Sequence, residues 1–130
     1  MPTRYQQLRQ AVATLAAPAE EQVRYLNKIF TSVTSGGSAA GYGNDELALE
    51  LDDFLLAADD MVEHGELTQG EKQAVQQIDL LLTRWSSEEN ADFWRRDALF
   101  HDPRWVEIRS CAARILARLP DEERAIGRSA

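Results

Sequence analysis

The chain has 130 residues, of which 44% are hydrophobic and 28% are charged, and its formal net charge is −8. This length corresponds to one domain that can bury roughly two-thirds of its unfolded surface, and the composition excludes a chain that is disordered throughout. The only cysteine cannot form an internal disulfide, and no apolar run reaches the length of a signal peptide or a membrane span, so we expect a cytoplasmic protein without a membrane segment.

Two helices are expected before residue 34. Their apolar faces are formed by Tyr5, Leu8, Val12 and Leu15 in the first and by Val23, Leu26, Phe30 and Val33 in the second. Pro18 ends the first helix or begins the second, since proline is tolerated in a first helical turn. Because almost nothing joins them, the two helices are expected to be antiparallel neighbours. Residues 34–44 hold four of the seven glycines and predict a mobile loop, in which Tyr42 either folds back onto the core or contacts a partner.

The stretch from Asn44 to Glu71 contains ten carboxylates and no lysine or arginine, which leaves 12 acidic against 14 basic residues in the rest of the chain. It predicts one long amphipathic helix, capped by Asn44 or Asp45 and ended by Gly65. Glycine suits this end because the residue after a helix often adopts the left-handed backbone conformation. The core face of this helix consists of Leu47, Leu51, Phe54, Leu55, Ala58, Met61 and Val62. The acids occupy the rest of its circumference.

Thr68 and Glu71 match a capping box and predict the start of a fourth helix. Its apolar face consists of Ala74, Val75, Ile78, Leu81, Leu82 and Trp85. Asp79 interrupts this run and is either exposed or partly buried against an arginine or an amide.

Residues 86–101 predict a short helix, capped by Ser86 or Ser87 and broken near Phe100, which contains Phe93 and Trp94. Asp102 and Pro103 then form a helix start signal. The final helix presents Trp105, Ile108, Ala112, Ile115, Leu116 and Leu119 on one side and ends at Pro120. Residues 121–130 predict a frayed tail.

No segment alternates between polar and apolar residues in the manner of a strand. The sequence therefore predicts an all-α, single-domain bundle spanning 1–130, with about five main helices and one short helix. No internal repeat divides the chain.

No residue pattern indicates catalysis or a cofactor. His64 and His101 belong to no zinc motif, and the Gly-rich segment has neither the lysine nor the preceding strand of a phosphate loop. Asp60 and His64 are four residues apart and could share a metal, but the other helices offer no matching ligand motif. Cys111 has no base beside it and is expected to be a small core or boundary residue. We expect neither an enzyme nor a metal or cofactor site.

Direct nucleic-acid binding is not expected, because the acidic block would repel phosphate. Several arginines do gather in the last third of the chain, and they are expected to pair with the acidic helix or to form a solvated face. They are Arg95, Arg96, Arg104, Arg109, Arg114 and Arg118.

The acidic helix is instead predicted to bind a basic protein, with two leucines outside the core face as apolar anchors and the acids as a steering field. The predicted partner-binding residues are Asp45, Glu46, Leu49, Glu50, Asp52, Asp53, Leu56, Asp59, Asp60 and Glu63. Two other interpretations stay open: the acids only make the protein soluble, or a second packing layer covers Leu49 and Leu56.

Several local motifs resemble small α-helical immunity proteins of bacterial contact-dependent growth inhibition and related polymorphic toxin systems. The resembling residues are Leu51-Asp52, Gly65-Glu66-Leu67-Thr68, Glu71, Ile78-Asp79, Leu82, Asn90, Trp94, Asp97-Ala98-Leu99, Pro103, Trp105, Ile108-Arg109, Ala112 and Leu116. The chain departs from the family pattern at Arg95 and Asp97, where that pattern has threonine and glutamate.

This resemblance implies a cytoplasmic protein that binds and neutralises one cognate toxin domain, often a nuclease. The sequence leaves an alternative, a non-enzymatic helical adaptor or regulatory protein that self-associates through Leu49 and Leu56. It does not predict the oligomeric state or the identity of the toxin.

Overall fold

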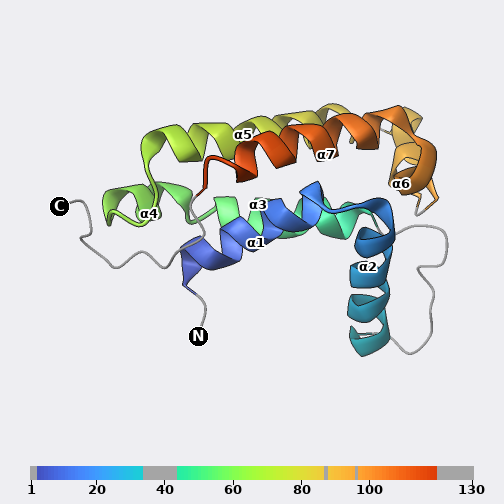
Figure 1. Ribbon diagram of the computed structural model, residues 1–130, viewed down its shortest axis with the longest axis horizontal. Coiled ribbons are helices and arrows are strands. Elements are labelled where there is room, and N and C mark those ends of the chain that lie inside the picture. Colours follow the sequence, from blue (N-terminus) through green and yellow to red (C-terminus); the bar gives the residue numbers. More distant parts are fainter. Residues whose placement is uncertain (1–2, 34–43, 87, 96, 120–130) are drawn as a thin grey trace.

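The computed structural model describes residues 3–33, 44–86, 88–95 and 97–119 (Figure 1). The helices are α1 (Arg4–Ala16), α2 (Ala19–Val33), α3 (Asp45–Leu55), α4 (Ala58–Glu63), α5 (Gln69–Arg84), the 3-10 helix η1 (Glu88–Trp94), α6 (Ala98–His101) and α7 (Pro103–Leu116). No strand occurs in these residues, so the all-α prediction is confirmed. The five main helices are present, but three short helical elements accompany them where one was predicted.

Four helices enclose most of the core. In Figure 1, α1 and α3 lie together on one side and α5 and α7 on the other, and each pair packs against the other through α1 with α7 and α3 with α5. The largest fully buried side chains are Trp105, Tyr5, Phe93, Leu8, Leu15, Leu26, Leu47, Leu51, Met61, Ile78, Leu99 and Ile108. The helical periodicity therefore identified the buried faces of α1, α3, α5 and α7 correctly, and the burial of Cys111 is also confirmed.

The antiparallel arrangement predicted for the first two helices is wrong. Helix α2 crosses one end of the bundle instead of running back along α1 (Figure 1), and it packs mainly on α6. At the corner between the two helices, the buried Gln22 donates through Nε2 to the carbonyl oxygens of Thr14 and Leu15, at 3.1 Å each. The Thr14 carbonyl also accepts from the Ala17 N–H at 3.3 Å. These bonds hold the first turn of α2 against the end of α1. The side chains of residues 29–33 lie outside the described part of the protein.

The single long helix predicted after Asn44 is also wrong, because it is interrupted between α3 and α4. Leu56 and Ala57 form the break: Ala57 has φ −93° and ψ 0°, and its N–H bonds to the carbonyl of Phe54, three residues back. Leucine and alanine are strong helix formers, so local propensity gives no warning of this interruption. The redirected α4 still buries Ala58 and Met61, which the helical pattern had assigned to the core.

Most of the predicted helix boundaries are confirmed by their caps. Gly65 has the expected positive φ of 75°. The Thr68 hydroxyl accepts from the Glu71 N–H at 3.1 Å while the Glu71 carboxylate accepts from the Thr68 N–H at 2.9 Å. Asp102 accepts from the Arg104 N–H at 2.9 Å and begins α7.

Asn44 precedes α3 but does not cap it with its side chain. Its buried Nδ2 instead donates to the carbonyls of Phe93 and Arg95, at 3.3 and 2.6 Å. The amide therefore ties the start of α3 to a segment about fifty residues later, which sequence alone could not reveal.

The segment after α5 differs in detail from its prediction. Phe93 and Trp94 lie in η1 as expected, but α6 includes Phe100, and the chain breaks before α6 and again at Asp102. Ser86 donates to the Thr83 carbonyl at 2.7 Å and so closes α5 instead of capping η1. The predicted loop at 34–43, including Tyr42, and the predicted tail at 121–130 lie outside the described residues.

Candidate functional site

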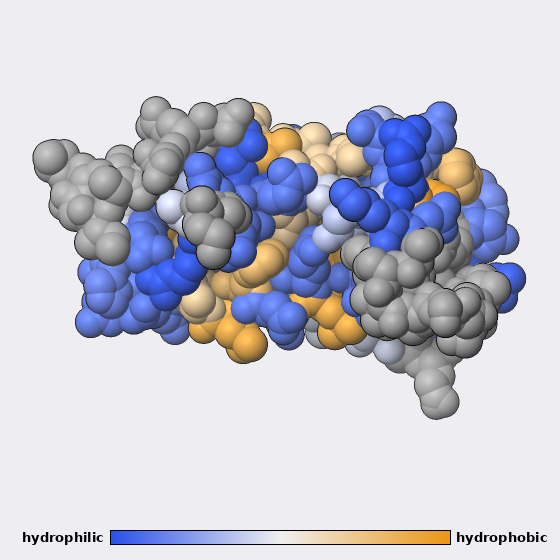
Figure 2. All heavy atoms as spheres, turned by 90° about the horizontal axis from the view of Figure 1, so that it is seen from below, coloured by the Kyte–Doolittle hydropathy of each residue, from blue (hydrophilic) through white to orange (hydrophobic). Residues whose placement is uncertain are grey.

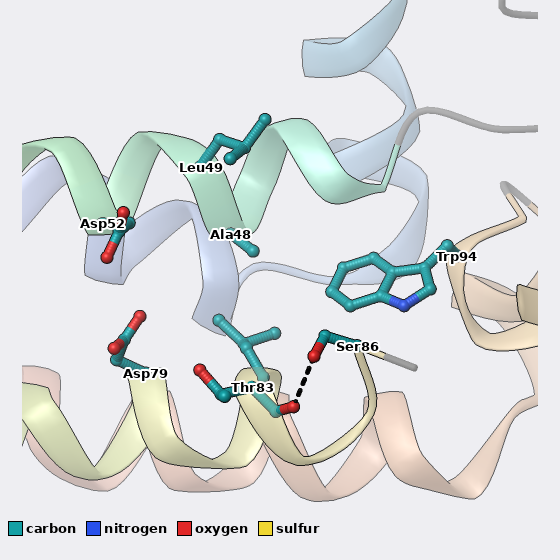
Figure 3. Close-up of a pocket in the computed structure, with 8 residues that line it drawn as sticks. Ala48, Leu49, Asp52, Asp79, Thr83, Ser86 and Trp94 are labelled. Atoms are coloured by element: carbon teal, nitrogen blue, oxygen red, sulfur yellow. Dashed lines mark hydrogen bonds between the residues drawn. The ribbon is translucent and has the colours of Figure 1, made fainter. Parts of the chain in front are cut away.

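A pocket of about 560 Å³ lies between α3 and α5 (Figure 3). Its lining residues are Ala48, Leu49 and Asp52 from α3, Asp79, Leu82 and Thr83 from α5, and Ser86 and Trp94 beyond them. This volume is within the range of roughly 300–1,000 Å³ that is typical of pockets for small-molecule ligands. The walls are mostly apolar, and two carboxylates supply the charge.

Asp52 and Asp79 point toward one another across this pocket (Figure 3). Partial burial raises the pKa of Asp79, and the negative charge of Asp52 raises it further. Within the described part of the chain, neither carboxylate has a hydrogen-bond or ion-pair partner. A partly buried Asp79 was expected to lie against an arginine or an amide, but the charge that acts on it among the described residues is that of a second acid.

Two other polar groups of the pocket already donate to backbone carbonyls. The Trp94 indole N–H donates to the Trp85 carbonyl at 2.8 Å, which fixes the ring at one end of the pocket, and the Ser86 hydroxyl donates to the Thr83 carbonyl. Leu49 stands at the rim with 51% of its surface exposed. The two carboxylates are the charged groups of the pocket, and they offer acceptors to a ligand.

Several acids of the predicted binding surface have partners inside the protein, so the description of an uncompensated block is wrong in part. Arg4 binds one of them, since its Nη1 lies 2.8 Å from Asp60. Its Nε and Nη2 also lie 3.0 and 2.6 Å from the two carboxylate oxygens of the buried Glu66, which belongs to the acidic stretch but not to the predicted binding residues. Asp59 pairs with Lys72. Glu50 accepts from the Tyr25 hydroxyl, and burial together with this bond raises the pKa of Tyr25.

The other predicted acids have no cation beside them in the described structure. Asp53 and Glu63 are exposed and Glu46 is half-buried, while the side chain of Asp45 lies outside the described part. Because the acids surround α3 on its several outer sides, the structure does not gather all of them on one face. It brings Leu49 and Asp52 together with Asp79, and it places Glu50 in a separate hollow with Phe54 and residues of α1.

Neither predicted anchor leucine is covered by a second packing layer in the described residues. Leu56 is 79% exposed at the break after α3, and it does not line the pocket that Leu49 borders. Figure 2 shows the side where α1 and α3 lie, on which apolar side chains surface in separate places between hydrophilic ones. Leu49 and Leu56 are both exposed, but they do not line the same pocket.

Arg104 and Arg109, two arginines of the last third, bind residues outside the acidic helix. Arg104 binds Asp102 at 2.6 Å and Asp92 at 3.1 Å, and it also lies over the rings of Trp85 and Phe93. Arg109 donates to Gln22 at 3.0 Å. Arg96 lies outside the described residues. Arg4 from the first helix and Lys72 from α5 do bind acids of this stretch, and the sequence pattern did not indicate the role of Arg4.

His64 and Asp60 do lie together, with the imidazole Nδ1 2.8 Å from the Asp60 carbonyl oxygen and 3.5 Å from its carboxylate. This contact raises the pKa of His64. Among the described residues, no three potential ligands are grouped so that they could hold a metal, and no helix is both long and apolar enough to cross a bilayer.

No protein-family model matches the chain, and neither the curated proteins nor the solved structures include one that is significantly similar to it. Any function must therefore be argued from the residues and their arrangement.

Proposed function

We propose that this protein is a cytoplasmic immunity protein that binds and neutralises a cognate basic toxin domain, such as a nuclease, by covering its active cleft with the outer surface of α3. The observation that carries the proposal is the pair of carboxylates, Asp52 and Asp79, that face each other across an open, largely apolar pocket and have no ion-pair partner among the described residues. The protein acts by binding and needs no catalysis, metal or cofactor of its own.

The buried position of Asp79 and the nearby negative charge of Asp52 disfavour ionisation of Asp79, so its negative charge destabilises the free protein. A basic partner would reverse this effect by bringing a positive charge between the two carboxylates. The exposed acids Asp53 and Glu63 add to the same negative field, which speeds the encounter with a basic surface and disfavours neutral or acidic proteins. The likeness of the helix caps and tryptophan motifs to immunity proteins of toxin systems supports the same function.

The direct test is to co-express this chain with the C-terminal domain encoded by the gene immediately upstream. We expect a complex that survives purification and a host that grows despite the toxin. The toxin expressed alone gives the control for growth inhibition. If both proteins are folded and neither a complex nor rescue is found, the proposal is wrong.

A second candidate function is a helical adaptor that self-associates, which the exposure of Leu49 and Leu56 favours. Light scattering of the free protein over a range of concentrations separates the two. The adaptor predicts a dimer that Leu56→Asp converts to a monomer, whereas the immunity protein needs no dimer. Leu80→Asp is a suitable control, because Leu80 is an equally apolar exposed residue on α5.

A further inference from the structure

We infer that the pocket between α3 and α5 receives the side chain of one arginine of the partner protein, with its guanidinium between the carboxylates of Asp52 and Asp79 and its aliphatic stem along Ala48 and Leu82. This inference rests on the proposed function and names the chemistry of its central contact. The inference concerns the contact made in one pocket, whereas the proposed function concerns inhibition of the toxin by the whole protein.

Charge complementarity identifies the occupant as a cation. The two carboxylates come from different helices and are held toward each other by the packing of α3 on α5. Neither carboxylate has a hydrogen-bond or ion-pair partner among the described residues. The Ser86 hydroxyl and the Trp94 indole N–H, which also line the pocket, already donate to backbone carbonyls. A cation placed between the two carboxylates would relieve their repulsion and satisfy both.

Three arginines of the described helices are engaged elsewhere. Arg4 is bound to Asp60 and Glu66, Arg104 to Asp92 and Asp102, and Arg109 to Gln22. None of these partners lines the pocket. We therefore assign the pocket to a cation of the second protein that the proposed function already requires.

The shape of the pocket favours arginine over lysine. The walls of Ala48 and Leu82 suit an aliphatic stem, and Trp94 offers an aromatic ring at the end of the pocket. A guanidinium is planar and can donate to two carboxylates at once, whereas an ammonium is a compact, strongly hydrated charge. An anchoring side chain with these properties is typical of the buried centre of a protein interface.

The first test measures dissociation of the complex with the upstream-encoded toxin domain. Asp52→Asn and Asp79→Asn should each increase the dissociation rate about tenfold or more, because loss of a desolvated charge partner acts mainly on dissociation. The matched control is Glu107→Gln, which removes one charge from an exposed position on α7 and should leave that rate unchanged. Unchanged dissociation of both pocket variants would overturn the inference while leaving the immunity function intact.

The second test needs no toxin and uses N-acetyl-arginine methylamide as a probe. Nuclear magnetic resonance of the full chain should show saturable shifts of the Trp94 indole N–H and of the Ala48 and Thr83 amides, with smaller shifts for the lysine analogue. The double variant Asp52→Asn/Asp79→Asn should abolish them. Equal shifts in the double variant, or no saturable shift up to the solubility limit of the probe, would overturn the inference.

These two tests separate the possible failures. Binding of the arginine probe without any toxin complex would support the pocket and reject the proposed partner. A dimer of the free protein that both pocket variants convert to monomer would assign the pocket to an arginine of a second copy, and would overturn the inference as stated.

Discussion

Asp79 shows how a single residue can be unfavourable for folding and still be useful. It interrupts an apolar run of α5, is partly buried, and faces another acid instead of a base. Residues that lower stability without a structural benefit are typical of functional sites. The sequence identified Asp79 as unusual, but its partner in space, Asp52, became evident only from the packing of α3 against α5.

At this scale we predict that Asp79→Asn raises the melting temperature at pH 7. The pKa of Asp79 is raised on folding, so the ionised side chain destabilises the folded protein above that pKa. As the pH falls and Asp79 becomes protonated, this penalty disappears, and the variant and wild type should converge near pH 4 or below, close to the ordinary carboxyl pKa of about 3.9. Calorimetry across this range measures the difference, and Asp53→Asn, at an exposed position of α3, is the control. A lower melting temperature for Asp79→Asn at pH 7 would contradict the prediction.

At the scale of elements, the residues that start and end a helix were predicted more accurately than whether a long helical pattern would continue without a break. The capping box at Thr68, the glycine stop at Gly65 and the Asp102-Pro103 start all form as their residues dictate, because each depends on atoms within one turn of chain. The break at Leu56 and Ala57 has no such local cause. It results from where the core, Arg4 and α5 require α4 to lie.

The capping box leads to a prediction for α5. Thr68→Ala should lower the free energy of unfolding by about 1 kcal/mol, since it leaves the N–H of Glu71 without its acceptor. Thr68→Ser keeps the hydroxyl and should recover most of that loss. Urea denaturation followed by circular dichroism gives both values, and equal stability of the alanine and serine variants would show that the cap does not stabilise α5.

At the scale of the whole molecule, contacts between distant segments hold the ends of the chain together. Helix α1 packs on α7, Arg9 donates to the Leu119 carbonyl at 3.0 Å, and Arg4 reaches Glu66 across 62 residues of sequence. Loss of such a contact is expected to destabilise the fold and not merely one helix.

We therefore predict that Arg4→Ala lowers the free energy of unfolding by about 1–3 kcal/mol, because Glu66 then keeps a buried charge without its guanidinium. Arg24→Ala, at an exposed position of α2, should change stability little. Chemical denaturation of both variants provides the comparison. Adding Glu66→Gln to Arg4→Ala should restore part of the loss, and no restoration would exclude the unpaired charge as its cause.

The electrostatic field of the molecule gives a further prediction for toxin binding. Asp53→Lys should slow association with the toxin domain and weaken its dependence on salt, since it reverses a charge that lies outside any described ion pair. Asp60 is a poorer choice for this experiment, because its reversal would also break the contact with Arg4. Glu107→Lys on α7 is the matched control. An association rate that Asp53→Lys leaves unchanged in stopped-flow measurements would exclude steering by α3.

The sequence by itself determined the helical class, the core faces and most of the helix ends, because periodicity and caps act within a few residues. It also identified Leu49 and Asp52 as outward-facing members of the acidic helix. Only the tertiary structure decided the crossing of α2, the break between α3 and α4, and which acids are neutralised by Arg4 and Lys72. It also decided that Asp79 and Trp94 share a pocket with Asp52. These features depend on residues that are far apart in the chain and meet only when the helices pack.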